Sequence, residues 1–306
     1  MENLIYHYTS MNVFLHLVES LDNNENFIFQ ASDVFYMNDP QEYIYGQKVL
    51  INVIKKIEES RNIPISERLS EYFVNSDAID IDCICKCLSN VSHQDYNTPF
   101  VISFSKNKDS LPMWLNYGSN GSGVCLGFQL TKTNIQEVEI GTKTFTFQSA
   151  MDWKDVKYYS IDDKKKNGKD HGLYKMIERS YNHLYNDNNR KGMKVDEFKI
   201  QTLQNLFIDY CPYIKRIDYE YEQEVRIARK VRITSKDDLS NLNFRINSKG
   251  NVIPYINIEI PKEYLKLVKI GPLANYELTS SALKMIKEKY DLDYDLSQSC
   301  VKYRNY

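Results

Sequence analysis

The sequence has little cysteine. Its 306 residues include six cysteines, at positions 83, 85, 87, 125, 211 and 300. So sparse a set is typical of reduced thiols rather than of a disulfide framework. The run DIDCICKC places three of them close together and His93 follows, but structural zinc sites usually draw C-x₂₋₄-C pairs from two places in the chain. We therefore expect small buried thiols in this run and no metal site.

The sequence also lacks a long apolar run, the pattern of a signal peptide in its first residues, and an excess of one charge. Its apolar stretches fall far short of the ~20 residues that cross a bilayer, and MENLIYHYTS does not have the basic-then-apolar order of a signal peptide. We therefore expect a cytoplasmic protein with no membrane partner. The formal net charge of −2 gives no global attraction to nucleic acid. Basic stretches such as DDKKKNGK and RIARKVR are local, and they are more typical of solvated faces than of phosphate clamps.

What is present is the composition of a globular protein, with 42% hydrophobic and 26% charged residues. LIYHYTS predicts a strand, and Thr9 or Ser10 then caps a helix with apolar residues at helical spacing. MNDPQEY predicts the start of a second helix, with Asp39 as N-cap, Pro40 as first helical residue and Glu42 as capping-box partner.

Runs of predicted strands alternate with clustered helices along the chain. Strands are predicted in TPFVISFS, around 124–128, at 217–233 and at 251–260, whereas residues from about 160 to 212 predict a helical insertion packed on a sheet. We expect one domain over residues 1–306, of α+β class with a mixed or mostly antiparallel sheet.

The segment DYEYEQEVRI, residues 218–227, places two acids on what its pattern predicts to be a strand. Glu222 and Glu224 would then lie on one face, about 6.5–7 Å apart along the chain. Arg226 would share that face. A solvated strand edge with a charge pair is the structural alternative to a functional site.

Two other strand segments have polar groups that a buried strand does not need: YHYTS, with His7, Tyr8 and Thr9, and ISFS, with Ser103 and Ser105. Each has a structural explanation, as a satisfied histidine or as serines bonded to neighbouring backbone. LPMWLNYG likewise predicts either an aromatic helix with Trp114 in the core or a stacking surface, and GSNGSG predicts a tight turn rather than a phosphate-binding loop.

The order of these segments resembles the ADP-ribosyltransferase superfamily. YHYTSMNVFLHLVES is similar to the first strand and helix of its histidine branch, while SFS and EQE are similar to the Ser-x-Ser and Glu-x-Glu strands of its arginine-and-serine branch. Over most of the chain, LIYHYTS, MNDPQE, ISFS, LPMWLNYGSNGSGVCLGF, YEQEVRI, VKIGPLA and SCVKYR together resemble a bacterial family labelled domain of unknown function 2971.

The resemblance implies an ADP-ribosyltransferase-like sheet and cleavage of the nicotinamide–ribose bond of NAD, which is the substrate. A carboxylate beside the ribose stabilises the oxocarbenium-like transition state of such a cleavage. The resemblance assigns this role to Glu224, and it assigns orientation or deprotonation of the acceptor to Glu222.

The resemblance also implies the rest of the ligand site. His7 would donate to a ribose hydroxyl, with Tyr8 and Thr9 beside it. Ser103 or Ser105 would shape the nicotinamide pocket, and Tyr117 or Trp114 would stack on the departing ring. Arg226 either pairs with one of the acids or meets a pyrophosphate.

The function expected from the resemblance is mono-ADP-ribosylation of a protein or nucleic acid by a toxin or phage-defence effector, with an antitoxin or defence protein as possible partner. Two alternatives stay open. One is NAD hydrolysis without transfer, and the other is a catalytically inactive module that binds a nucleotide or senses a phage component. A nucleic-acid-binding role has only the local basic stretches in its favour.

Overall fold

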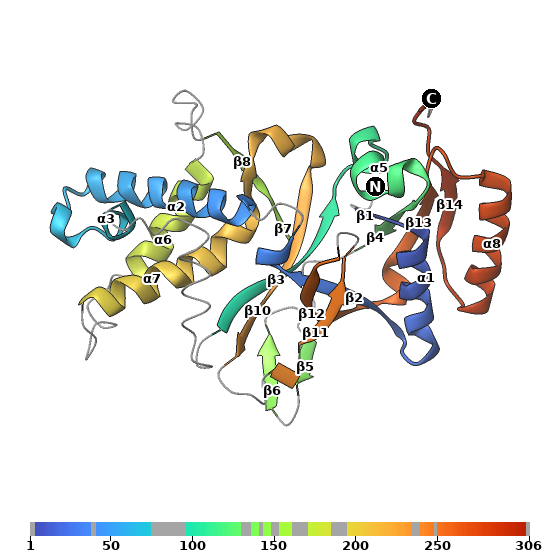
Figure 1. The fold of residues 1–306 in the computed structure, drawn as a ribbon, viewed down its shortest axis with the longest axis horizontal. Coiled ribbons are helices and arrows are strands. Elements are labelled where there is room, and N and C mark those ends of the chain that lie inside the picture. Colours follow the sequence, from blue (N-terminus) through green and yellow to red (C-terminus); the bar gives the residue numbers. More distant parts are fainter. Residues whose placement is uncertain are drawn as a thin grey trace.

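The structure is a computed structural model of an α+β protein built on a mixed sheet (Figure 1). It describes residues 4–37, 41–74, 96–129, 136–140, 143–147, 153–160, 171–184, 195–233, 239–240, 242–247 and 250–303. The α+β class and the mixed sheet expected from the sequence are thereby confirmed. The predicted N-cap Asp39, Pro40, the cysteines at 83, 85 and 87, and His93 lie outside the described residues.

Seven α-helices and fourteen strands fall within the described residues. The helices are α1 (Met11–Glu19), α2 (Gln41–Ser60), α3 (Leu69–Val74), α5 (Leu111–Tyr117), α6 (His171–Leu184), α7 (Val195–Tyr210) and α8 (Tyr276–Lys289). The strands are β1 (Ile5–Thr9), β2 (Asn26–Asp33), β3 (Tyr96–Ser105), β4 (Val124–Phe128), β5 (Gln136–Ile140), β6 (Lys143–Phe147), β7 (Trp153–Asp155), β8 (Lys157–Tyr159), β9 (Ile214–Arg216), β10 (Glu224–Ile233), β11 (Asn243–Ile246), β12 (Val252–Pro261), β13 (Leu265–Ile270) and β14 (Asp295–Gln298).

The main sheet runs in the order β11-β12-β2-β3-β1-β4-β13-β14, and β10 joins it by pairing with β3. Strand β10 follows one edge of β3 along its whole length, from Glu224 opposite Ser105 to Ile233 opposite Tyr96. The other edge of β3 is divided between two strands. β2 pairs with it at Phe100 and Val101, and β1 pairs with it at Ser105.

Strands β1 and β2 therefore diverge from the middle of β3, between residues 102 and 104. The sheet is split at this point, and backbone groups of β3 there face a gap between its two neighbours. His7 of β1 reaches into the split, where its Nδ1 lies 3.0 Å from the carbonyl oxygen of Ser103. A side chain thus replaces part of the missing strand pairing.

One face of the sheet is covered by α1 and α8. Alternate residues of the central strands, such as Phe29, Phe104 and Val225, pack in one core with Phe14 of α1 and Leu283 of α8. Ser10 caps α1, since its side chain accepts a hydrogen bond from the Val13 amide at 3.1 Å. The strand, cap and helix expected at the N-terminus are confirmed.

The opposite face meets a second core built from α2, α3, α6 and α7, which Figure 1 shows gathered at one end of the molecule. The described helices α6 and α7 fall inside the predicted helical insertion, and they pack against α2 and the sheet residue Val101. None of the described helices is long and apolar enough to cross a bilayer.

The predicted strand over residues 217–233 is wrong in its first part. Residues Ile217–Glu222 form a 3-10 helix, Gln223 has left-handed backbone angles (φ 43°), and β10 begins at Glu224. Alternation of acids and tyrosines suggested a strand, but the Gln223 amide donates to the Glu220 carbonyl and closes a turn there. Glu222 and Glu224 consequently meet across a turn and not along a strand face.

Candidate functional site

A cavity of about 560 Å³ lies where the split in the sheet meets the helical end of the molecule. Its walls come from seven strands, β1, β2, β3, β9, β10, β11 and β12, and from the start of α2, the end of α5 and the turn before β10. Seven of the ten residues predicted from the sequence line it: His7, Tyr8, Ser103, Tyr117, Glu222, Glu224 and Arg226. Three distant parts of the chain therefore meet at one cavity.

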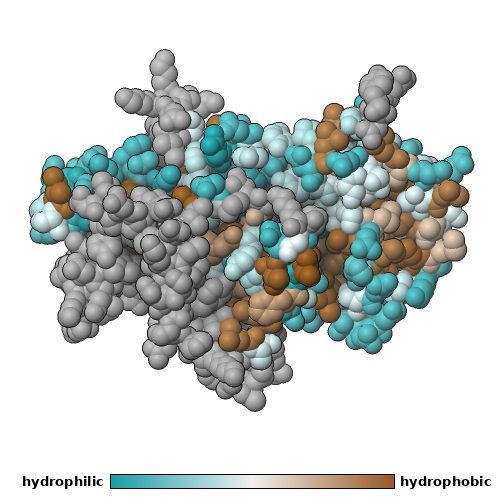
Figure 2. Space-filling view, in the orientation of Figure 1, coloured by the Kyte–Doolittle hydropathy of each residue, from teal (hydrophilic) through white to brown (hydrophobic). Residues whose placement is uncertain are grey.

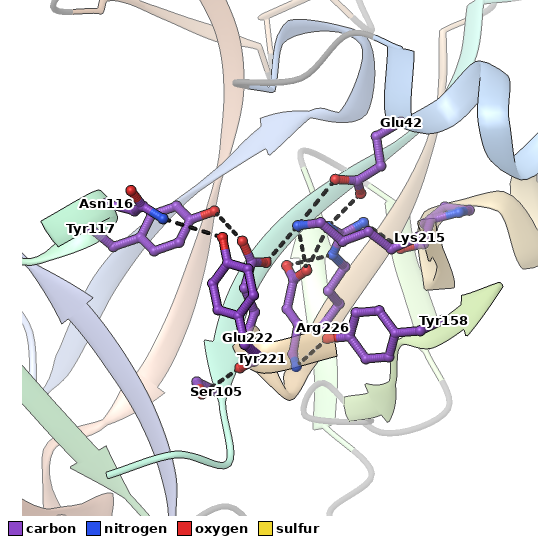
Figure 3. Close-up of polar contacts among 11 residues, drawn as sticks. Glu42, Ser105, Asn116, Tyr117, Tyr158, Lys215, Tyr221, Glu222 and Arg226 are labelled. Atoms are coloured by element: carbon purple, nitrogen blue, oxygen red, sulfur yellow. Dashed lines mark hydrogen bonds and ion pairs between the residues drawn. The ribbon is translucent and has the colours of Figure 1, made fainter. Parts of the chain in front are cut away.

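The centre of the site is Lys215 of β9, whose ammonium group lies between three carboxylates (Figure 3). Its Nζ is 2.6 Å from Glu222 Oε2, 3.2 Å from Glu224 Oε2 and 3.3 Å from Glu42 Oε2. Each of these side chains is nearly buried, with at most 10% of its surface exposed. Lys215 thus neutralises acids from α2, from the 3-10 turn and from β10 at once.

Arg226 is the second cation of the site and is fully buried. Its Nε and Nη2 donate to the two oxygens of Glu224 at 2.7 and 2.8 Å, a bidentate pair. The same Nη2 is 2.5 Å from Glu42 Oε1, and Nη1 donates to the Pro212 carbonyl at 2.6 Å. Of the two roles predicted for Arg226, the structure shows the pairing with an acid.

The two acids next to the turn differ in their proton affinity. Burial raises the pKa of Glu224, but Arg226 and Lys215 outweigh it and lower the pKa to about 2. Burial raises the pKa of Glu222, and here the raising effect prevails over the bond from Lys215. Glu224 is hence the more firmly ionised group, and Glu222 is the one more readily protonated.

The two acids also differ in the lone pairs that remain available. Glu224 accepts from Nε and Nη2 of Arg226 and from Lys215, and Ser103 adds a further bond. A carboxylate offers about four acceptor sites, so Glu224 is saturated. Glu222 accepts from Lys215 and from the Tyr117 hydroxyl, 2.9 Å away, which leaves it capacity for a ligand hydroxyl.

The end of α5 supplies the aromatic side of the cavity. Tyr117 donates to Glu222, and the amide of Asn116 donates to the Tyr221 hydroxyl at 3.3 Å (Figure 3). Pro112 stands in the first turn of α5, where its missing amide is harmless, and Gly118 follows the last residue of the helix. These signals place Tyr117 at the end of the helix that faces the acids.

His7 lies in the split of the sheet and lines the same cavity as the acids. Its ring packs against Phe29 and Phe104, with ring centroids 5.4 and 5.5 Å apart. Burial lowers the pKa of His7, while the bond with the Ser103 carbonyl opposes that effect. A neutral imidazole that donates through Nδ1 to this carbonyl has Nε2 left as an acceptor.

Three predicted site residues do not line the cavity. Trp114 is fully buried, packs edge-on against Tyr8 and donates from Nε1 to Asp109. The buried Ser105 hydroxyl donates to the Glu222 carbonyl at 2.6 Å and accepts from the Asn107 amide. Thr9 is buried at the end of β1, and Gly123 packs closely against the backbone carbonyl of Thr9. The side chains of Trp114 and Ser105 hold the walls in place, and they correspond to the structural alternatives considered for Trp114 and for the serines.

Tyr8 lines the cavity, but its hydroxyl points into the wall. It donates to the Asn107 carbonyl at 2.8 Å and accepts from the Ser110 amide at 3.1 Å. Tyr8 thereby anchors the loop that leads into α5.

Sequence reasoning missed Lys215, Glu42 as a site residue, and Arg245. Lys215 stands in the short strand IKR, where no periodic pattern distinguishes it, and Glu42 was explained as part of a capping box. A buried pair of acids needs buried cations to compensate its charge. A lysine or arginine between apolar residues, such as Lys215 in PYIKRI, is therefore the sequence signal that indicates such a cation. In the described part of the chain, no group of three His, Cys, Asp or Glu side chains is arranged to hold a metal ion.

The fold and the site define an α+β protein whose split sheet encloses a cavity beside a buried network of three acids and two cations. Residues 113–227, which contain most of α5 and also Lys215, Glu222, Glu224 and Arg226, match the family model described as "Protein of unknown function (DUF2971)". This match supports the resemblance to that family noted in the sequence. Neither the curated proteins nor the solved structures include a match to the chain.

Proposed function

We propose that the chain is an ADP-ribosyltransferase that binds NAD in this cavity, on an ADP-ribosyltransferase-like sheet, and transfers ADP-ribose to a protein or nucleic acid. The observation that supports this proposal is that His7, Ser103, Glu222 and Glu224, which come from three separate segments, line one cavity of about 560 Å³. That volume lies within the range of ligand pockets, roughly 300–1,000 Å³.

The acids are the groups that would assist cleavage of NAD. As the bond between nicotinamide and ribose breaks, positive charge develops on the sugar, and a nearby carboxylate lowers the barrier. Glu222 has the open lone pairs that can accept a ribose hydroxyl, whereas Glu224 is saturated by Arg226, Lys215 and Ser103. We therefore assign the ligand contact to Glu222, and we assign to Glu224 the role of keeping the two cations in place.

The aromatic and histidine walls complete the proposed site. Tyr117 lies beside Glu222 and can stack on the nicotinamide ring, and Nε2 of His7 can accept from a ribose hydroxyl. Bacterial toxin or phage-defence activity, with an antitoxin or defence protein as partner, is the biological setting that the family resemblance implies.

The experiment is a Glu222→Gln substitution in the full chain, followed by incubation with labelled NAD and a cell extract. We expect transfer of label to fall about 100-fold or more, because the charge facing the ribose is lost. The matched control is Glu58→Gln, which changes a buried acid outside the cavity. An unchanged rate in Glu222→Gln, with both variants folded, would overturn the proposal.

A second candidate function is a nucleotide-binding or sensor module without catalysis. It is favoured by one observation: both oxygens of Glu224 and one oxygen of Glu222 are already bound by cations. Calorimetry that detects NAD binding, together with no release of nicotinamide, would favour this candidate. Free ADP-ribose in excess of attached ADP-ribose would instead indicate an NAD glycohydrolase.

A further inference from the structure

Arg245 is a third cation at the cavity, and its surroundings differ from those of Lys215 and Arg226. It lies on the edge strand β11, where exposure alternates: Phe244 and Ile246 are 62% and 72% exposed, while Arg245 between them is half-buried. Figure 2 shows apolar side chains over β11 and β12 in the middle of this face. The alternation turns Arg245 away from them, and its side chain lines the cavity.

Neutral groups hold the guanidinium of Arg245 in place. Its side chain crosses β12 to reach β2, where Nη1 donates to Gln30 Oε1 at 2.7 Å and Nη2 donates to Ser32 Oγ at 2.6 Å. The Tyr255 ring of the intervening strand lies under it, with 5.6 Å between Cζ and the ring centroid. Gln30 and Ser32 point to the cavity because Phe29 and Ala31, which alternate with them, point to the core.

No carboxylate of the described chain lies within ion-pair distance of Arg245. A guanidinium has five N–H groups, and two of them are used by Gln30 and Ser32. Burial lowers the pKa of Arg245, the direction expected for a cation without a compensating charge, whereas the acids around Arg226 raise the pKa of that group. The remaining N–H groups of Arg245 are therefore available to an anion in the cavity.

The other two cations that line the cavity, Lys215 and Arg226, are not available to bind an anion. Lys215 contacts three carboxylates, and Arg226 is fully buried against Glu224 and Glu42. An anion near them would meet the carboxylates first. At Arg245 an anion meets a planar donor fork and no acid of the described residues, and phosphate oxygens match such a fork.

We propose that Arg245, positioned by Gln30 and Ser32, forms an oxyanion site that binds the phosphate groups of a nucleotide whose sugar faces Glu222. This inference rests on the proposed function for the orientation of the ligand, and it names the group that holds the phosphates. The site itself requires only a phosphate-type anion, from a nucleotide or from free pyrophosphate.

The test measures binding by calorimetry of four probes to the full chain: ADP-ribose, adenosine, inorganic pyrophosphate and NAD. We expect wild type to bind ADP-ribose more tightly than adenosine. In Arg245→Met we expect the affinity for ADP-ribose to fall about 10- to 100-fold, as for loss of charged hydrogen bonds, with the adenosine affinity unchanged. Arg179→Met, an exposed arginine on α6, is the matched control and should bind like wild type.

A second variant separates charge from geometry. Arg245→Lys keeps the positive charge but not the fork, so we expect an affinity for ADP-ribose between those of wild type and Arg245→Met. At one fixed concentration of ADP-ribose, the melting temperature of wild type should rise more than that of Arg245→Met.

The outcomes distinguish the two proposals. Binding of pyrophosphate that needs Arg245, with no binding of NAD, would support the oxyanion site and overturn the proposed function. NAD or ADP-ribose binding that is equal in wild type and Arg245→Met would overturn the oxyanion site, whatever the transfer assay shows. Failure of wild type to bind any phosphate-bearing probe would overturn it as well.

Discussion

A single buried acid in the helical end and a buried group of acids at the cavity differ in the partners that stabilise them. Glu58 of α2 is fully buried and accepts from the amides of Leu69 and Ser70, from the Ser70 hydroxyl and from Tyr181. All of these donors are neutral, and the two amides belong to the first turn of α3. At the cavity, Glu42, Glu222 and Glu224 depend on Lys215 and Arg226 instead.

The difference indicates which acid is structural and which acids suit a ligand site. Glu58 caps a helix through fixed neutral donors, so its side chain is part of the packing of α2 against α3. The acids at the cavity share two cations that each contact more than one carboxylate. All three acids line the cavity, and Glu222 keeps acceptor capacity for a ligand. A ligand can replace part of such a network without unfolding a helix.

Breaking the cavity network at Arg226 should have the largest effect. Arg226→Met leaves Glu224 and Glu42 buried without their main partner, which should reduce the free energy of unfolding by about 3–5 kcal/mol. Urea denaturation measures this loss. Arg179→Met should change the free energy of unfolding by less than about 0.5 kcal/mol. A loss below about 1 kcal/mol in Arg226→Met would mean that the network is not a unit of the fold.

Acid should weaken the cavity network in a defined pH window. Because the pKa of Glu224 is lowered from 4.5 to about 2, its stabilising contribution is complete above the ordinary value and is lost as the pH falls towards about 2. The shift corresponds to stability on the order of 3 kcal/mol. Glu222 acts in the opposite direction, since its pKa is raised and its stabilising contribution is lost as the pH rises through the raised value.

The measurement is the free energy of unfolding at a series of pH values for wild type and Glu224→Gln. We expect the advantage of wild type over the variant to shrink between about pH 5 and about pH 2. A constant difference over that window would show that Glu224 has no lowered pKa.

Glu58→Gln should have the smallest of these effects on stability, and it should not change the affinity for the ligand. The amide keeps an acceptor but loses the charge and places a donor opposite the amides of α3, which should reduce the free energy of unfolding by about 1–3 kcal/mol. Affinity for ADP-ribose, measured by calorimetry, should equal that of wild type. A changed affinity would contradict the separation between Glu58 and the acids at the cavity.

Local signals in the sequence predicted the elements that frame the site. Alternation in LIYHYT and ISFS predicted β1 and β3, Ser10 was one of two expected caps of α1, and the proline and glycine around LPMWLNYG bounded α5. These signals work because strand and helix periodicity and end-capping depend on neighbours in the sequence.

The site itself was only partly predictable. His7, Glu222 and Glu224 were predicted to meet, but the turn at Gln223 and the contacts of Lys215, Glu42 and Arg245 depend on segments up to 215 residues apart. No local pattern indicates that Lys215 lies between three acids, because that arrangement arises only when α2, β9 and β10 pack together. Trp114 and Ser105 were predicted to contact the ligand, but their polar groups bond to other residues in the walls of the cavity.

The divided edge of β3 has a thermodynamic consequence. The same strand is bonded to β2 at its middle, to β1 at its C-terminal end and to β10 along its opposite side. Separating the two halves of the sheet would therefore break the ladder between β3 and β10, so we expect the backbone of β3 beside the cavity to keep its position when a ligand binds. Binding should then require little ordering of the backbone, and the entropy lost on association should come mainly from side chains at the rim.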